Sequence, residues 1–416
     1  MRIVIRRDNL AFGLYIIATL TVAATAWRPV ANVEVSDWLF GGSMIAAILL
    51  SPGALVRAVV ALPRLAIVGA AALVLGTAVS LHASAFPALS LGILARFIFL
   101  IIFWLALGLV TLPTYNRIRV AVQAWTASAA IVGYTGVLEV LFHVHLFGAP
   151  NFSYVGRASG LTLHPNDLGA VCSFAFAPAA SLLISSTRTT SIIARVLVMA
   201  GILAGILVSG SVDGYIVTLV TGVGWLATLR SRRRTAWIVV AAASAMVLLL
   251  ASLAPAIHIR SPLQRIAQVT AANPTASLGT RLQLASETLH VISQHPLVGV
   301  GLDPASEQKY VPFYPENMLL VAWLGAGALG LVGVLLIAVA IGLRAIWIFG
   351  ADELARSVSL SYIGFLIYAQ ASPLLQQRFA WMPAAMIIAL CPIVARNDVA
   401  VKEERSPQAY PSAVSV

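Results

Sequence analysis

The sequence predicts an all-α, polytopic membrane protein, and three observations lead to that prediction. Of its 416 residues, 60% are hydrophobic and only 10% are charged. The mean hydropathy of the chain is +0.93. Apolar runs of about 18 residues or more recur along the whole length, and each is long enough to cross a hydrocarbon core of about 30 Å. A soluble domain does not need so much apolar surface.

Twelve apolar segments are expected to be membrane spans, each defined to within a few residues at its ends. They lie at residues 10–27, 38–52, 65–82, 88–112, 119–142, 166–186, 192–209, 212–229, 236–255, 317–341, 356–372 and 379–395. Nine spans therefore fall within residues 1–255 and three within 316–397. A polar loop at 256–315 separates them, and we expect the tail at 398–416 to be disordered.

The distribution of basic residues predicts the orientation. If the N-terminus is cytoplasmic, the inner segments hold 18 Lys and Arg residues and the outer segments hold seven. Cytoplasmic loops carry such an excess, so both termini are expected in the cytoplasm and the 256–315 loop outside. The start of the chain also resembles a cleavable signal peptide, with Arg6 and Arg7 before an apolar run. An uncleaved first span fits better with the eleven spans that follow.

Composition excludes several classes of function. The formal net charge is +11, but the basic residues lie in short clusters between apolar runs, so a nucleic-acid-binding face is not expected. Cys172 and Cys391 both lie in apolar runs, which argues against a disulfide framework or a zinc site. No phosphate-binding Gly-rich loop or nucleotide fingerprint is present, so neither cytoplasmic ATP nor another cofactor is expected.

Two outward segments have enough polar groups to form a site. In the first, at 143–165, Gly156 and Gly160 allow the backbone to turn tightly beside Arg157. Arg157 either anchors at the lipid headgroups or faces a cavity, where its planar guanidinium suits a phosphate. In the second, the long loop, apolar spacing from Arg281 to Gln294 predicts an amphipathic helix at the outer surface. Arg281 at its start is either solvated or part of a covered site.

Other polar residues allow both a structural and a functional interpretation. Glu316 lies in the first turn of a span, where the helix dipole favours an acid, and it is also a candidate general base. Arg96 lies inside a span, where an ionisable side chain either faces a cavity or extends to the headgroups. Asp213 lies in a tight outer turn and is interpreted as a turn former.

Taken together, these segments resemble the superfamily of O-antigen ligases and polymerases, which includes exopolysaccharide polymerases. The resemblance covers roughly residues 150–335. It rests on a series of short motifs in order: Gly156-Arg157 and Gly160, His164-Pro165-Asn166, Gly279-Thr280-Arg281, His295-Pro296-Leu297-Val298-Gly299-Val300-Gly301, Pro315-Glu316-Asn317, and Gly325, Gly327 and Gly330.

The resemblance implies a GT-C-like, inverting glycosyltransferase at the outer face of the cytoplasmic membrane. Its donor would be an undecaprenyl-pyrophosphate-linked glycan, and its acceptor a hydroxyl of a glycan or lipid-linked glycan, without metal or nucleotide. By carry-over, Arg157 and Arg281 would hold the pyrophosphate. Arg96, His164 and Asn166 are further candidates for substrate binding. Glu316 and Asn317 are the candidates for catalysis.

The chain departs from the superfamily pattern at two positions. The family commonly has His-Asn where this chain has Glu316-Asn317, and Ser-Arg where it has Ser211-Val212. A carboxylate can accept a proton from a sugar hydroxyl, so Glu316 is able to replace a histidine base chemically. Two alternatives stay open: a twelve-span transporter or flippase, and a non-catalytic partner of a polysaccharide assembly complex.

Overall fold

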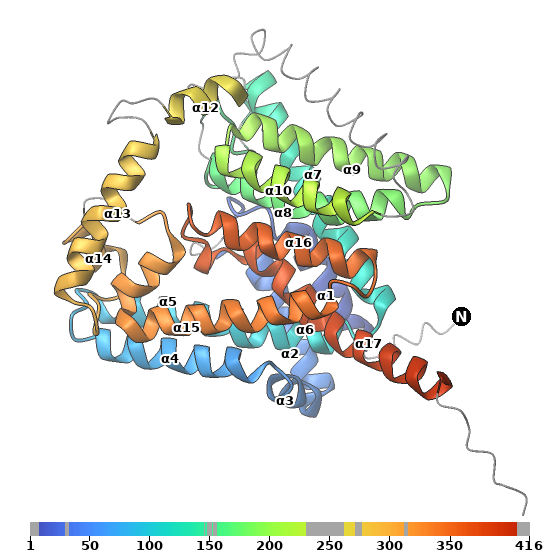
Figure 1. Cartoon of the computed structure of the whole chain (residues 1–416), viewed down its shortest axis with the longest axis horizontal. Helices are drawn as coiled ribbons and strands as arrows, with labels where there is room; N and C mark the ends of the chain where they lie inside the picture. Colours follow the sequence, from blue (N-terminus) through green and yellow to red (C-terminus); the bar gives the residue numbers. More distant parts are fainter. Residues whose placement is uncertain are drawn as a thin grey trace, which may run out of the picture.

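The computed structural model describes residues 8–29, 33–144, 146–147, 152, 156–229, 262–270, 277–311 and 315–405. This part of the chain is all-helical (Figure 1). Its first half contains α1 (Asp8–Thr21), α2 (Val35–Leu50), α3 (Pro52–Val60), α4 (Arg64–Ser80), α5 (Pro87–Ile98), the π-helical turn η1 (Phe99–Trp104), α6 (Leu105–Thr111), α7 (Tyr115–Phe142), α8 (Pro165–Ile184), α9 (Thr189–Ser209) and α10 (Val212–Thr228). Its second half contains α12 (Pro262–Thr270), α13 (Ser277–Gln294), α14 (Pro304–Gln308), α15 (Met318–Ile348), α16 (Glu353–Tyr368), the short turns η3 (Leu374–Gln376) and η4 (Arg378–Trp381), and α17 (Met382–Arg405).

Six helical segments within the described residues are long and apolar enough to cross a membrane. They are Pro87–Thr111, Tyr115–Phe142, Pro165–Ile184, Thr189–Ser209, Met318–Ile348 and Arg378–Asn397. Helices α2 and α3 add a seventh if they form one span, although they meet at a bend of 110°. Three shorter apolar helices lie at Asn9–Thr21, Arg64–Ser80 and Val212–Thr228. The protein is therefore a multi-pass membrane protein, and the expected span at 236–255 lies outside the described residues.

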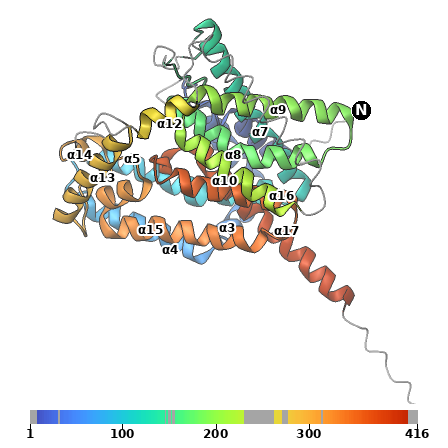
Figure 2. The same cartoon turned by 45° about the horizontal axis from the view of Figure 1, so that its top comes forward.

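Helices α4 and α15 lie side by side along their lengths (Figures 1 and 2). Glycines on both helices allow this close approach. A Cβ at Gly69 would lie 2.6 Å from the carbonyl oxygen of Gly333, and a Cβ at Gly333 would lie 2.6 Å from that of Gly69. Small residues drive helix association in membranes because they let backbones come into contact. Side chains at these two positions would force the pair apart.

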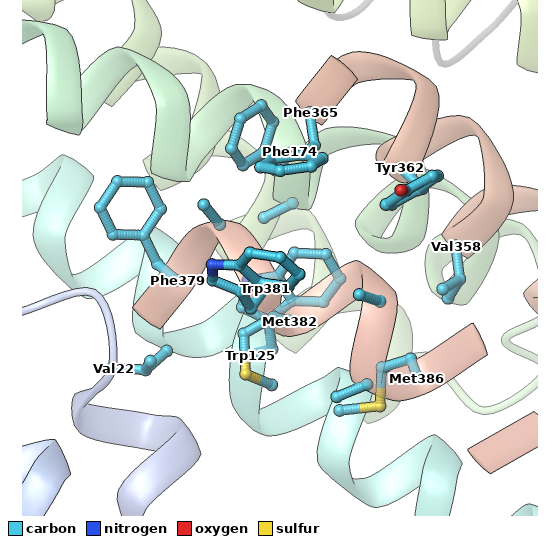
Figure 3. Close-up of a cluster of buried hydrophobic side chains, with 14 of the residues drawn as sticks. Val22, Trp125, Phe174, Val358, Tyr362, Phe365, Phe379, Trp381, Met382 and Met386 are labelled. Carbon is cyan, nitrogen blue, oxygen red and sulfur yellow. The ribbon is translucent and has the colours of Figure 1, made fainter. Parts of the chain in front are cut away.

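The core between the two halves of the bundle is rich in aromatic side chains (Figure 3). Phe174 of α8 lies 6.3 Å from the ring of Phe365 and 5.6 Å from that of Tyr368, both on α16. The ring of Phe379, in η4, lies 6.4 Å from that of Phe174. These edge-on and tilted contacts join α8 to the C-terminal helices.

Helices α12, α13 and α14 gather at one end of the molecule, and α17 extends from the other (Figures 1 and 2). Helix α13 covers the 281–294 range expected to form an amphipathic helix. Its apolar residues Leu284, Val291 and Ile292 pack with Leu324 at the start of α15. We call the end that holds α12–α14 the loop end of the bundle.

Helix α15 is broken near its first turns, at Gly327, where φ is +66°. The segment that follows α13 fills the break. Val300 N–H donates to the Leu324 carbonyl at 2.8 Å, and Gly301 N–H donates to the Gly325 carbonyl at 3.1 Å. Backbone groups released by the break are thus satisfied by the loop, as a membrane protein requires. This contact fixes the loop against the helix that begins just after Glu316.

Helix α17 continues to Arg405, beyond Asp398, where a disordered tail was expected to begin. Residues 398–405 continue the helical backbone of the preceding span. A helix that is already nucleated extends by one hydrogen bond per residue, so it does not need an apolar face to continue for two turns.

Candidate functional site

Arg157 lies in a loop that a buried carboxylate holds in shape. Glu139 of α7 is 2% exposed. Its side chain accepts hydrogen bonds from the backbone N–H groups of Ser159 at 2.9 Å and Gly160 at 2.7 Å. Gly160 has a φ of +57°, and a Cβ there would lie 2.5 Å from the Val132 carbonyl oxygen. The loop therefore packs directly on α7 and presents Arg157 at the start of α8.

The Arg157 guanidinium is fixed by uncharged oxygen atoms. Its Nε donates to the Ser209 carbonyl at 2.7 Å, and its Nη2 donates to Asn166 Oδ1 at 2.6 Å. Ser209 ends α9 and Asn166 lies in the first turn of α8. Arg157 thus joins its own loop and the start of α8 to the end of α9, 52 residues further along the chain.

A second guanidinium reaches the same turn from the long loop. Arg265 of α12 donates from Nε to the Gly210 carbonyl at 3.1 Å. Gly210 follows Ser209 directly, so Arg157 and Arg265 bind adjacent carbonyl groups between α9 and α10. Two like charges lie close together here.

Arg281 brings a third guanidinium and two acids. Its Nη1 lies 2.9 Å from Asp213 Oδ2, in the first turn of α10. Its Nε pairs with Glu316 Oε2, just before α15. The Arg281 and Asp213 side chains are 21% and 16% exposed, whereas Glu316 is 43% exposed. Ion pairs therefore tie helix α13 to the start of α10 and to the residue just before α15, and Glu316 keeps an accessible face.

The charges of the site shift the pKa values of its members. Burial, followed by the neighbouring guanidinium groups of Arg265 and Arg281, lowers the pKa of Arg157 to about 10. Burial also acts to lower the pKa of Arg281, but Asp213 and Glu316 outweigh it and the net direction is upward. The pKa of His164 falls to about 4 because its ring is partly buried and faces Arg157 and Arg281. Arg157 therefore stays charged at neutral pH, and His164 stays neutral.

His164 and Asn166 support the arginines rather than forming a separate group. His164 Nδ1 accepts the Asn166 N–H at 3.1 Å and so caps the N-terminus of α8. Behind Asn166, the Tyr368 hydroxyl donates to the Asn166 carbonyl at 2.6 Å and lies 2.9 Å from Ser211 Oγ. These bonds connect α8, α10 and α16 directly below the guanidinium groups.

Asn317 has a structural role. Its Oδ1 accepts the N–H groups of Leu319 at 2.9 Å and Leu320 at 3.1 Å, capping α15. Its Nδ2 donates to the Gln370 carbonyl at 3.1 Å. Asn317 therefore fixes the position of Glu316 relative to the end of α16.

Arg96 lies apart from the three guanidiniums. It lines a cavity of about 340 Å³ together with Asp37 of α2 and Arg378 of η4. Arg378 forms a two-pronged ion pair with Asp37, at 2.6 and 2.7 Å, and reaches Glu34 at 3.1 Å. The structure thus brings Arg157, Arg281, His164, Asn166 and Glu316 into one site, whereas Arg96 lines a cavity that contains none of these residues.

Sequence reasoning missed several members of the site. Arg265 was considered only as one of the seven basic residues of the outer segments, and Asp213 was interpreted as a turn former. Tyr368 and Glu139 were not singled out, because each lies in an apolar run and acts across the bundle. An acid or hydroxyl inside a predicted span was the one sequence signal for them.

The arrangement suits binding of a polyanion beside a carboxylate. Among the described residues, the guanidiniums of Arg157, Arg265 and Arg281 lie together with the two acids Asp213 and Glu316. Guanidinium groups match phosphate oxygens in pairs. Within the described parts of the chain, no group of three or more His, Cys, Asp or Glu side chains is placed to hold a metal ion.

Comparison with family models places part of the chain in a known family. The family model described as O-antigen ligase matches residues 196–336, which run from α9 to the middle of α15 and include Asp213, Arg265, Arg281 and Glu316. No curated protein matches the chain. The family match supports placing the chain in the O-antigen ligase superfamily, which its sequence resembles.

Proposed function

We propose that this member of the O-antigen ligase superfamily transfers an undecaprenyl-pyrophosphate-linked glycan to a hydroxyl acceptor at the outer face of the cytoplasmic membrane. It would either polymerise the glycan or ligate it to another lipid-linked glycan. The protein would have a GT-C-like scaffold of twelve spans. Its 256–315 loop would lie outside, and both termini would lie in the cytoplasm. A match to the family supports a membrane enzyme of polysaccharide assembly.

The observation that carries the proposal is the convergence of Arg157, Arg265 and Arg281. Among the described residues, the contacts of Arg157 are to a carbonyl and an amide oxygen, so no carboxylate neutralises its charge. Burial, and then the positive charges of Arg265 and Arg281, raise the cost of that charge and lower the pKa of Arg157. A pyrophosphate would relieve this repulsion, since an anion stabilises all three cations at once.

The chemistry of transfer would follow from this placement. The acceptor oxygen attacks the anomeric carbon, the bond from that carbon to the pyrophosphate oxygen breaks, and the bonding electrons leave with the pyrophosphate. The arginines stabilise the negative charge that grows on the leaving group. The proton of the acceptor hydroxyl passes to the Glu316 carboxylate. One displacement of this kind inverts the anomeric configuration.

The two departures from the superfamily pattern have a structural counterpart here. The turn at Ser211-Val212 lacks the arginine expected from the pattern, and the Arg265 guanidinium is hydrogen-bonded to Gly210 beside that turn. Glu316, in place of histidine, pairs with Arg281 and keeps an accessible face. We infer that Arg265 supplies the missing positive charge and that Glu316 takes the role of the base.

Substitution of the site tests this proposal. Arg157→Gln, Arg281→Ala and Glu316→Gln should each reduce glycan chain extension about 100-fold or more in cells that lack the native protein. Glu287→Gln is the matched control, because Glu287 lies on the same helix as Arg281 and bonds Gln283 at 2.8 Å, away from the site. Protein level in the membrane is measured alongside. Full-length glycan in all three variants would contradict the proposal, and transport of glycan by purified protein without transfer would favour a transporter.

A further inference from the structure

A second cluster of arginines lies at the opposite end of the bundle from the loop end. There, a cavity of about 310 Å³ is lined by Arg119 of α7, Arg188 before α9 and Arg195 of α9. Ser185, Ser186 and Ser191 line it as well. The described residues around it include no Asp or Glu. The cavity therefore offers three cations and several hydroxyl donors.

An apolar cavity of about 270 Å³ continues from it between α7 and α9. The two cavities share Gln123, Ser191 and Arg195, and the second is lined mainly by Ala127, Ala179, Leu182, Ala194 and Val198. Neighbouring side chains are exposed: Ile193 and Leu197 of α9 are each 56% exposed. In a bilayer this outer side of the two helices faces lipid.

The packing of α7 and α9 explains why the cavities lie at this end. Nearer the middle of the two helices, the backbones touch, since a Cβ at Gly201 would lie 2.8 Å from the Ala130 carbonyl oxygen. Towards the start of α9, the helix carries the larger side chain of Arg195 instead of a glycine. Arg195 donates from Nη1 to the Leu182 carbonyl and to Ser186 Oγ, which holds its guanidinium at the junction of the two cavities.

We propose that the paired cavities bind one anionic glycerophospholipid, with its phosphate among the three arginines and an acyl chain in the apolar groove. The charge is complementary, because the cavity is cationic and none of its described lining residues is an acid. The polarity is complementary as well, because a polar cavity opens into an apolar one along a lipid-facing groove. Basic pockets between spans on the cytoplasmic side favour anionic headgroups in the same way. This site is separate from the arginines at the loop end.

Binding of phosphatidylglycerol to the purified full-length protein in detergent tests the proposal. The double variant Arg119→Gln with Arg188→Gln should bind it about tenfold or more weakly. The matched control, Arg57→Gln with Arg64→Gln, removes two exposed arginines from α3 and the start of α4 and should bind as the wild type does. Phosphatidylethanolamine carries no net charge. Its affinity for the wild type should be no higher than the affinity of phosphatidylglycerol for the double variant.

A second variant separates a lipid from a free phosphate compound. Ala194→Phe should fill the apolar cavity and weaken phosphatidylglycerol binding, while soluble glycerol 3-phosphate should bind wild type and variant equally weakly. Equal phosphatidylglycerol affinity in the wild type and the double arginine variant would overturn the proposal. So would glycerol 3-phosphate binding as tightly as the lipid, because the ligand would then be a free phosphate.

Discussion

At the residue scale, the site depends on which groups share the Arg281 guanidinium. Asp213 and Glu316 both pair with it, and only Glu316 is substantially exposed. A phosphate that approaches Arg281 competes with Glu316 for the same N–H donors. Because Asp213 also holds the guanidinium, the proposed function would let Glu316 leave Arg281 and accept the proton of the acceptor hydroxyl. Binding of the donor and release of the base would then be one event.

His164 provides a pH-dependent test at this scale. Its folded-state pKa of about 4 lies below the value of about 6.5 for an unperturbed histidine. The neutral ring therefore contributes stability that is fully present above pH 6.5 and is lost as the pH falls from 6.5 towards 4. His164→Asn keeps a side-chain acceptor for the α8 N-cap but removes the titration. We expect the unfolding temperature to fall less in His164→Asn than in wild type between pH 7.5 and pH 5.

That comparison isolates one group, because every other titrating side chain is common to both proteins. An equal fall in unfolding temperature for the two proteins would contradict the charge environment assigned to His164. A larger fall in the variant would contradict it as well.

The residues of the site were only partly predictable. Arg157 and Arg281 could be picked out because they lie in the two polar outward segments, and Glu316 because it lies in the first turn of an expected span. Their grouping with Asp213 and Arg265 could not, since it depends on how α12 and α13 fold back over α10. Arg96 shows the limit of the same argument: an arginine within a span indicates a cavity, but not which cavity.

At the element scale, breaks in the helices matter more than their number. Positions of apolar segments were largely predictable from hydropathy, and α7, α8, α9 and α15 lie where spans were expected. Hydropathy could not predict the break in α15, the π-helical turn η1 or the bend between α2 and α3. Hydropathy averages over a window, so it does not detect a change in backbone direction inside an apolar run.

The break in α15 at Gly327 can be tested by substitution. Its φ of +66° disfavours any side chain, and a Cβ there would overlap the Leu297 carbonyl oxygen. Gly327→Ala should therefore lower the unfolding temperature and displace the loop that ends at Glu316, reducing glycan transfer. Gly342→Ala is the control in the same helix: its Cβ would meet only Tyr362, at 3.9 Å, and alanine favours a helix by about 0.5–1 kcal/mol over glycine.

Thermal unfolding in detergent and glycan chain length are measured for both variants. The opposite order of stability, with Gly342→Ala the less stable variant, would mean that the loop does not pack into the break as described.

At the scale of the whole molecule, the two ends of the bundle have different chemistry. The loop end holds Arg157, Arg265 and Arg281 together with Asp213 and Glu316. The opposite end holds Arg119, Arg188 and Arg195 in a cavity whose described lining residues include no acid. The excess of basic residues in alternate loops predicts that this opposite end faces the cytoplasm. Transfer at the outer face and lipid binding at the inner face both depend on that orientation.

Thiol labelling in intact cells tests the orientation directly. Cys172 and Cys391 are buried, so the native protein gives a low background. Ser286→Cys places a thiol on the exposed face of α13, and Gly350→Cys places one between α15 and α16, where a Cβ would meet nothing within 4 Å. A membrane-impermeant maleimide should label position 286 in intact cells and position 350 only after the cells are opened. The reverse pattern would put the arginine site in the cytoplasm, where a donor carried on the outer leaflet does not reach it.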